Sequence, residues 1–171
     1  MDRRHSAEIM GVYGKLIQRE MKETGVSIKS VLIGSPRFDV YASLEKKKMY
    51  NTQKSKQKVT FLCIAPPVFP GMATDTYDVE EYFKTIGSAL RTIPDSSAII
   101  KLRGKHRESF YRSAIDSAFV GVPYTIVKFE PLWNLYPQAD IVISCYSTAA
   151  LEALQCGKPL VYLGLSVGER M

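Results

Sequence analysis

Between residues 59 and 163 the sequence alternates short apolar runs with segments of helical periodicity, and this alternation constrains the fold more than any other feature. The apolar runs are residues 59–64, 98–102, 124–129, 140–145 and 160–163. The helical segments between them are residues 79–92, 107–119, 131–136 and 148–155. Nearly continuous apolar strands that alternate with helices indicate a parallel sheet covered on both faces. We therefore predict an α/β fold with a Rossmann-like, doubly wound parallel sheet.

The spacing of apolar residues also predicts which helix faces are buried. The helix at 79–92 should turn one apolar face inward, formed by Val79, Tyr82, Phe83, Ile86 and Leu90. The helix at 107–119 should bury Phe110, Ala114 and Ala118. In the first forty residues we expect one amphipathic helix that Gly25 ends, followed by a strand at 29–33.

The chain has 171 residues, enough for one domain with a substantial core. We divide it into an N-terminal helix and strand (1–44), a basic connector (45–58) and the Rossmann-like domain (59–171). The connector carries six lysines and almost no apolar residues, which favours a solvated linker over a binding patch. No apolar run approaches the roughly 20 residues that span a bilayer, and no secretory signal is expected.

Charge and cysteine content narrow the function classes. The formal net charge of +6 suits an anionic partner, such as nucleic acid, a membrane surface or a phosphorylated small molecule. The three cysteines, Cys63, Cys145 and Cys156, are widely spaced and lack metal-binding patterns, so we expect buried thiols in a reducing cytoplasm. We expect neither a metal nor another cofactor.

The segment 139–163, ADIVISCYSTAALEALQCGKPLVYL, carries the most chemical information. A buried strand leads into a helix whose N-cap is Ser147 or Thr148, and such a helix N-terminus favours a phosphate. Glu152 lies one turn deeper, where its carboxyl group could accept hydrogen bonds from the two hydroxyls of a ribose. The alternative is a capped helix whose glutamate points to solvent. The combined pattern favours the binding site.

The same segment resembles the donor-binding motif in the C-terminal domain of GT-B glycosyltransferases, including enzymes of capsule, polysialic acid and related surface polysaccharides. It is also similar to the UDP-N-acetylglucosamine 2-epimerases, which share that fold. Residues 31–39, VLIGSPRFD, resemble the segment through which such chains enter this domain. The likeness covers about residues 12 to 165 and implies that the chain is one half of a GT-B fold. It also implies that residues 59–171 are a nucleotide-sugar-binding domain, which we expect to be truncated at its C-terminus.

The resemblance implies roles for seven residues in binding a nucleotide sugar, and the sequence adds Tyr146 as an eighth candidate. Ser147 and Thr148 would bind the donor phosphate and Glu152 the ribose. The chain at Phe129 and Glu130 would hold the nucleobase, largely through backbone groups. Lys101 and Arg103 would face the phosphates or the sugar, although Arg103 stands where family members have histidine, and the basic loop is equally explained as plain surface. Tyr146 would stack or fill the crevice wall.

These features imply the donor-binding domain of a glycosyltransferase of surface polysaccharide or glycoconjugate synthesis, with a UDP- or CMP-linked sugar as ligand. The acceptor site, and usually the catalytic base, would belong to an N-terminal domain, so we expect the isolated chain to be inactive. Two alternatives stay open: half of a sugar-nucleotide 2-epimerase, and a non-catalytic nucleotide-binding module. We expect no nucleic acid partner. The expected location is cytoplasmic, and association of the full-length enzyme with the inner face of the membrane is left open.

Overall fold

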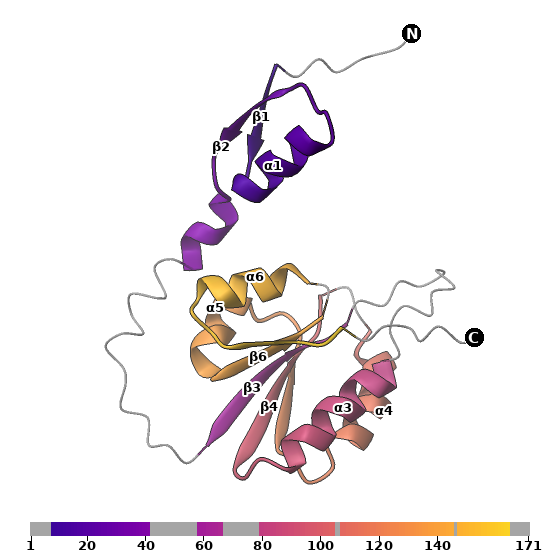
Figure 1. Ribbon diagram of the computed structural model, residues 1–171. Coiled ribbons are helices and arrows are strands. Elements are labelled where there is room, and N and C mark those ends of the chain that lie inside the picture. Colours follow the sequence, from indigo (N-terminus) through magenta and orange to yellow (C-terminus); the bar gives the residue numbers. More distant parts are fainter. Residues whose placement is uncertain (1–7, 42–57, 67–78, 105–106, 146, 165–171) are drawn as a thin grey trace, which may run out of the picture. The chain divides into compact units, whose positions relative to one another are not determined.

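The computed structural model describes residues 8–41, 58–66, 79–104, 107–145 and 147–164. The chain divides into two compact units, residues 1–39 and residues 40–171, whose elements are labelled in Figure 1. Most of the basic connector expected at 45–58, and the boundary expected at residue 44, lie outside the described residues.

The first unit is a small β-α-β arrangement. Strands β1 (Ile9–Val12) and β2 (Lys29–Leu32) pair in parallel, and helix α1 (Lys15–Glu23) connects them. Strand β1 was not predicted, because its four residues are interrupted by Gly11 and lie next to the stronger helical pattern. A short 3-10 helix, η1 (Pro36–Phe38), follows β2. Gly25 ends the α1 turn with φ +74°, as its position in the sequence suggested.

This unit buries little of its apolar surface. Among its described residues Val12 is buried, whereas many other apolar side chains are exposed. The exposed ones are Ile9, Met10, Tyr13, Leu16, Ile17, Val26, Val31, Leu32 and Ile33. Parallel sheets normally have both faces covered, so the unit presents an unusual amount of apolar surface to solvent.

The second unit contains a five-stranded parallel sheet with the order β5-β4-β3-β6-β7. Its strands are β3 (Val59–Ile64), β4 (Ser96–Lys101), β5 (Tyr124–Val127), β6 (Ile141–Ser144) and β7 (Leu160–Tyr162). The first strand of this sheet therefore lies between the second and the fourth, so strand order reverses between β3 and β6. This is the doubly wound, Rossmann-like sheet that the sequence predicted.

Helices cover both faces of this sheet. Helices α3 (Val79–Arg91) and α4 (Glu108–Ala118) lie together on one face. Helices α5 (Leu132–Leu135) and α6 (Thr148–Gln155) lie on the other (Figure 1), and a 3-10 turn, η2 (Tyr136–Gln138), follows α5. The predicted bounds of α6 and β3 match the structure residue for residue, and most other bounds differ by one or two positions.

The main core lies between α3, α4 and the sheet. All five residues predicted for the inner face of α3 are buried. The prediction that Phe110 of α4 points inward is wrong, because its side chain is 58% exposed and its neighbour Tyr111 is buried instead. The Tyr111 hydroxyl donates to the carbonyl oxygen of Pro66 at 3.0 Å, a partner that helical spacing alone does not reveal.

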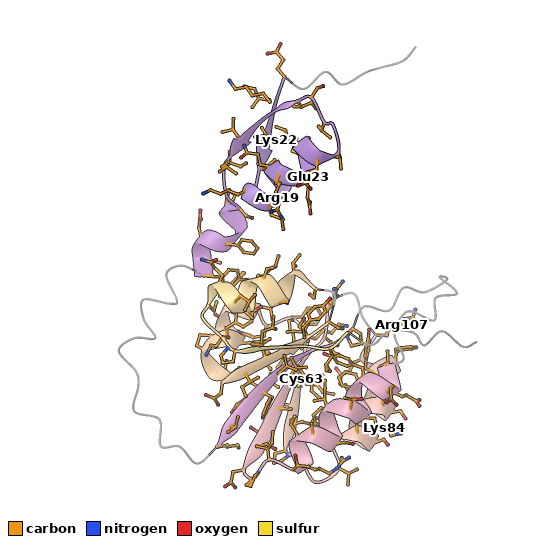
Figure 2. The ribbon with its side chains drawn as sticks, viewed as in Figure 1. Arg19, Lys22, Glu23, Cys63, Lys84 and Arg107 are labelled. Atoms are coloured by element: carbon orange, nitrogen blue, oxygen red, sulfur yellow. The ribbon has the colours of Figure 1, made fainter. Side chains whose placement is uncertain are left out.

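Alternate strand residues pack against the two helical layers, as strand geometry requires. Phe61 and Cys63 belong to the core under α3 and α4, whereas Leu62 is buried outside that cluster. Figure 2 shows Cys63 inside the unit and Lys84 and Arg107 at its periphery. All three cysteines are buried and free, as predicted.

Membrane-spanning helices and metal-binding groups are both absent from the described residues. None of their helices is long and apolar enough to cross a membrane. Within the same residues, no group of three or more His, Cys, Asp or Glu side chains is arranged to hold a metal ion.

Candidate functional site

The carboxyl ends of the central strands lie level with one another. Ile64 pairs with Lys101, and Lys101 pairs with Val127, while Cys63 pairs with Ile143 of β6. The segments that leave these strands therefore meet at one edge of the sheet, beside the reversal point between β3 and β6. In doubly wound sheets this edge is where ligands bind. Seven of the eight predicted site residues are described. Lys101 ends β4, and the other six come after β4, β5 or β6 in the chain.

Helix α6 begins at this edge directly after β6. Ser147 is its N-cap, with extended backbone angles, and its hydroxyl accepts a hydrogen bond from the N–H of Ala149 at 3.3 Å. Thr148 is exposed, whereas Ala149 and Ala150 turn their methyl groups inward and are buried. The exposed Thr148 hydroxyl and the positive end of the α6 dipole therefore lie at this edge, an arrangement suited to an anion.

Ser144, the last residue of β6, was not identified from the sequence. Its side chain is fully buried, and its hydroxyl has no hydrogen-bond partner within the part of the chain that the structure describes. A buried hydroxyl without a partner costs free energy, so its presence beside the start of α6 is notable. An apolar strand pattern with one serine at its carboxyl end is the only sequence signal that points to it.

Glu152 is almost completely buried, so the alternative in which it points to solvent does not apply. Its side chain has 1% of its surface exposed, and its Oε2 accepts a hydrogen bond from the Tyr41 hydroxyl at 2.7 Å. Thr148 and Glu152 therefore differ in exposure although they stand four residues apart. Hydrogen bonding is what makes a buried carboxyl group tolerable. No local pattern could have paired these two residues, because 111 positions separate them.

Arg103 comes near the end of β6. Burial raises the pKa of the Cys145 thiol to about 11, and the nearby Arg103 guanidinium acts in the opposite direction. This electrostatic influence means that the exposed Arg103, which follows β4, lies close to the residue that follows β6. The charge of Arg103 thus acts on Cys145, two residues before the Ser147 cap of α6.

Lys101 belongs to a neighbouring group at the end of β4 and β5. Its ammonium donates to the carbonyl oxygen of Lys128, and burial lowers its pKa while Glu130 acts to raise it. Glu130 is exposed, and its Oε1 accepts a hydrogen bond from Asn134 Nδ2 at 2.5 Å. Lys101 therefore connects the end of β4 to the loop after β5.

Phe129 stands at the tip of that loop with 81% of its surface exposed. The Lys128 Nζ lies 5.2 Å from the centroid of its ring, within the range of a cation–π contact. On another side the ring lies near Gly104, where an added Cβ would be 3.8 Å from it. The ring is thus largely exposed at the carboxyl edge, near Lys128 and Gly104. Tyr146, the remaining predicted site residue, lies outside the described residues.

The lysine of the Gly-Lys-Pro segment lies at the opposite edge of the sheet. Lys158 precedes β7 and is buried, and its Nζ donates to the carbonyl oxygen of Ala139 at 2.6 Å, just before β6. Both residues stand at the amino ends of parallel strands. Lys158 therefore serves the fold, and it does not extend the candidate site.

An open hollow of about 930 Å³ also lies at the amino edge, lined in part by Lys58, Arg91, Asp95 and Ser96. The Arg91 guanidinium donates to the carbonyl oxygen of Ala118 at 2.7 Å and to the Ser88 hydroxyl at 2.9 Å. The Ser96 hydroxyl donates to the carbonyl oxygen of Leu90. Arg91 and Ser96 therefore bind neighbouring elements of the same unit.

Comparisons with known proteins were made for the whole chain. No family model matches the chain, and no curated protein matches it. Among solved structures, the chain is similar to the crystal structure of WaaG, a glycosyltransferase involved in lipopolysaccharide biosynthesis. The identity is 15% and the TM-score 0.49, with 94% of this chain and 45% of that chain covered. The chain thus spans less than half of the length of WaaG.

Proposed function

We propose that the second unit binds the nucleotide part of an activated sugar and is the donor-binding half of a GT-B glycosyltransferase. The observation that carries the proposal is the start of α6 at the reversal point of the sheet, with a Ser147 cap and Glu152 on the same helix. The resemblance of residues 139–163 to the donor motif of that family supports the same assignment. Synthesis of a surface polysaccharide is the proposed setting.

The anion would lie against the N-terminus of α6. The hydroxyls of Ser147 and Thr148 and the helix dipole stabilise a phosphate there. Arg103 approaches from the end of β4 and supplies a permanent positive charge. As the bond between sugar and phosphate breaks, negative charge gathers on the nucleotide, and these groups are already oriented to stabilise it.

The base and the ribose would lie on either side of this phosphate. Backbone groups near Phe129 and Glu130 contact the base, and the exposed ring adds a flat apolar surface beside it. The carboxyl group of Glu152 accepts hydrogen bonds from the ribose hydroxyls. Lys101 keeps the loop after β5 in place through its bond to Lys128.

We also infer that the acceptor site belongs to another domain, which covers the first unit. The support is the surface of that unit, where apolar residues such as Leu16, Val31 and Ile33 are exposed. Surfaces of this kind are typical of contacts with another protein segment. Parallel sheets normally have both faces covered, so a further layer packed on this unit would bury these residues.

A thermal-shift screen with UDP, CMP, CDP and GDP, each free and linked to a sugar, tests the proposal. A nucleotide at about one hundred times its dissociation constant stabilises a protein by about 2.7 kcal/mol. For a chain of this size that corresponds to a rise in Tm of roughly 5 to 10 °C. Absence of a rise with every nucleotide, at concentrations up to 10 mM, would overturn the proposal.

Two pairs of variants locate the site. Arg103→Ala should weaken binding, whereas Lys84→Ala removes an exposed cation from the outer surface of α3 and should leave binding unchanged. Glu152→Gln preserves the shape of the buried side chain and should reduce the shift. Glu108→Gln changes a partly exposed glutamate of α4 in the same way and serves as its control. If the two variants of each pair change the nucleotide-induced rise in Tm equally, the binding site does not lie at this edge.

A further inference from the structure

The Tyr41 hydroxyl is hydrogen-bonded to the carboxyl group of Glu152, to which the proposed function assigns the ribose. It donates to Glu152 Oε2 at 2.7 Å, and both side chains are buried, with 3% and 1% of their surfaces exposed. A phenol hydroxyl that donates to a carboxyl oxygen makes the same contact as a ribose hydroxyl would. The chain therefore carries its own hydroxyl at this position.

A second tyrosine holds Tyr41 in place. The Tyr41 ring meets Tyr136 edge to face, with centroids 5.8 Å apart and an interplanar angle of 70°. The Tyr136 hydroxyl donates to the carbonyl oxygen of Ala149 at 2.8 Å. The two tyrosines thus bind successive turns of α6, one through a side chain and the other through the backbone. Their packing preference accounts for how Tyr41 is directed at Glu152.

We propose that Tyr41 is a built-in competitor of the ligand, and that a nucleotide binds by displacing its hydroxyl from Glu152. The inference rests on the proposed function. Tyr41 stands two residues after the boundary between the two units, in the short helical stretch at 39–41.

The energetic consequence is a penalty on affinity. In the unliganded chain Glu152 Oε2 is bonded to Tyr41, so a ribose hydroxyl can take that oxygen only in the fraction of molecules in which this bond is open. The apparent dissociation constant rises by the inverse of that fraction. Weakening the bond from Tyr41 should therefore tighten nucleotide binding, whereas a purely structural role of Tyr41 predicts weaker binding or no change.

The matched variants are Tyr41→Phe and Tyr136→Phe, each titrated calorimetrically with UDP and with CMP. Each removes one buried hydroxyl and keeps the aromatic ring pair. Tyr41→Phe should lower the dissociation constant by about tenfold, equivalent to about 1.4 kcal/mol. Tyr136→Phe removes the bond to Ala149 and should produce no such gain. A dissociation constant for Tyr41→Phe that equals or exceeds the wild-type value overturns the inference.

Hydrogen exchange of the unmodified chain gives a second readout that does not depend on a variant folding. Saturating nucleotide should speed amide exchange at residues 40–41 and slow it in the first turn of α6. Slower or unchanged exchange at residues 40–41 in the bound state counts against displacement. The two proposals fail differently. If binding depends on Glu152 but Tyr41→Phe does not bind nucleotide more tightly, only the competitor role of Tyr41 is overturned. If neither the wild type nor any variant binds nucleotide, the proposed function is overturned as well.

Discussion

Lys158 and Ala139 connect the amino ends of two neighbouring strands. The buried Lys158 ammonium donates to the Ala139 carbonyl oxygen at 2.6 Å, 19 residues away in the sequence. Through this bond the turn before β7 is fixed to the chain that enters β6. The contact lies at the end of β6 remote from Ser147, so the lysine supports the position of the strand from which α6 emerges.

Replacing Lys158 by methionine should destabilise the chain without altering its ligand site. The variant keeps the apolar stem but leaves the Ala139 carbonyl without this donor, at a cost of about 1 to 3 kcal/mol. Urea unfolding measures the loss. Nucleotide affinity, determined below the unfolding transition, should match that of the wild type, and a selective loss of affinity at unchanged stability would show that Lys158 acts in binding.

A methyl group at Gly87 should disrupt the contact between α3 and α4. A Cβ built there would lie 2.0 Å from the carbonyl oxygen of Ala118, a backbone atom that cannot move aside like a side chain. Overpacking of this kind costs about 1 to 3 kcal/mol or more, so Gly87→Ala should lower the urea midpoint clearly. Gly14→Ala, where nothing lies within 4 Å of the added Cβ, is the control. Equal midpoints for the two variants would contradict the close approach of the helices.

The Ser144 hydroxyl offers a direct comparison with a paired one. Ser144→Ala removes a buried hydroxyl without a partner among the described residues, and it should leave stability unchanged or raise it by up to about 1 kcal/mol. Ser96→Ala removes a buried hydroxyl that donates to Leu90 at 2.8 Å, and it should cost about 1 kcal/mol. Chemical denaturation of both variants checks the difference. If Ser144→Ala proves the more damaging variant, its hydroxyl has a partner after all.

Alkaline pH should destabilise the chain through its buried thiols. Burial raises the pKa of Cys63 from 9.0 to about 12 and that of Cys145 to about 11. Above pH 9 the unfolded chain loses these protons and the folded chain keeps them, so stability present below pH 9 declines as the pH rises toward 11 and 12. For Cys145 the loss at pH 10 is on the order of 1 kcal/mol.

Urea midpoints between pH 7.5 and pH 10 test this dependence. Lysines and tyrosines titrate in the same range, so the relevant quantity is the difference between the wild type and Cys145→Ala. The variant should lose less stability over this interval. Parallel curves for the two proteins would show that the Cys145 thiol does not contribute to the alkaline transition.

The sequence was sufficient for the elements that carry strong local patterns. The helix Thr148–Gln155 and the strand Val59–Ile64 have the predicted bounds, because N-capping, helix-ending and apolar signals coincide there. Strand β1 was missed because its pattern is short. The burial of Tyr111 in place of Phe110 depends on the carbonyl of Pro66, which only the tertiary fold supplies.

For the candidate site, the sequence predicted which chain segments follow the strands of the sheet, and it did not predict the contacts between their side chains. The order of the strands brings Lys101, Arg103 and Ser147 to one edge, as expected for a doubly wound sheet. The bond between Tyr41 and Glu152 could not be foreseen, because hydrogen bonds between distant residues leave no periodic trace in a sequence. The binding roles of these residues stay predictions.

The exposed apolar side chains of the first unit have a consequence for how this region tolerates change. Leu16 and Val31 have 58% and 42% of their surfaces exposed, so polar replacements there remove little buried area from the unit itself. Such replacements should be nearly silent in the folding of this chain and should improve its behaviour at high concentration. If apolar side chains are required at these positions, the requirement then comes from a binding partner that contacts them and not from the folding of the unit.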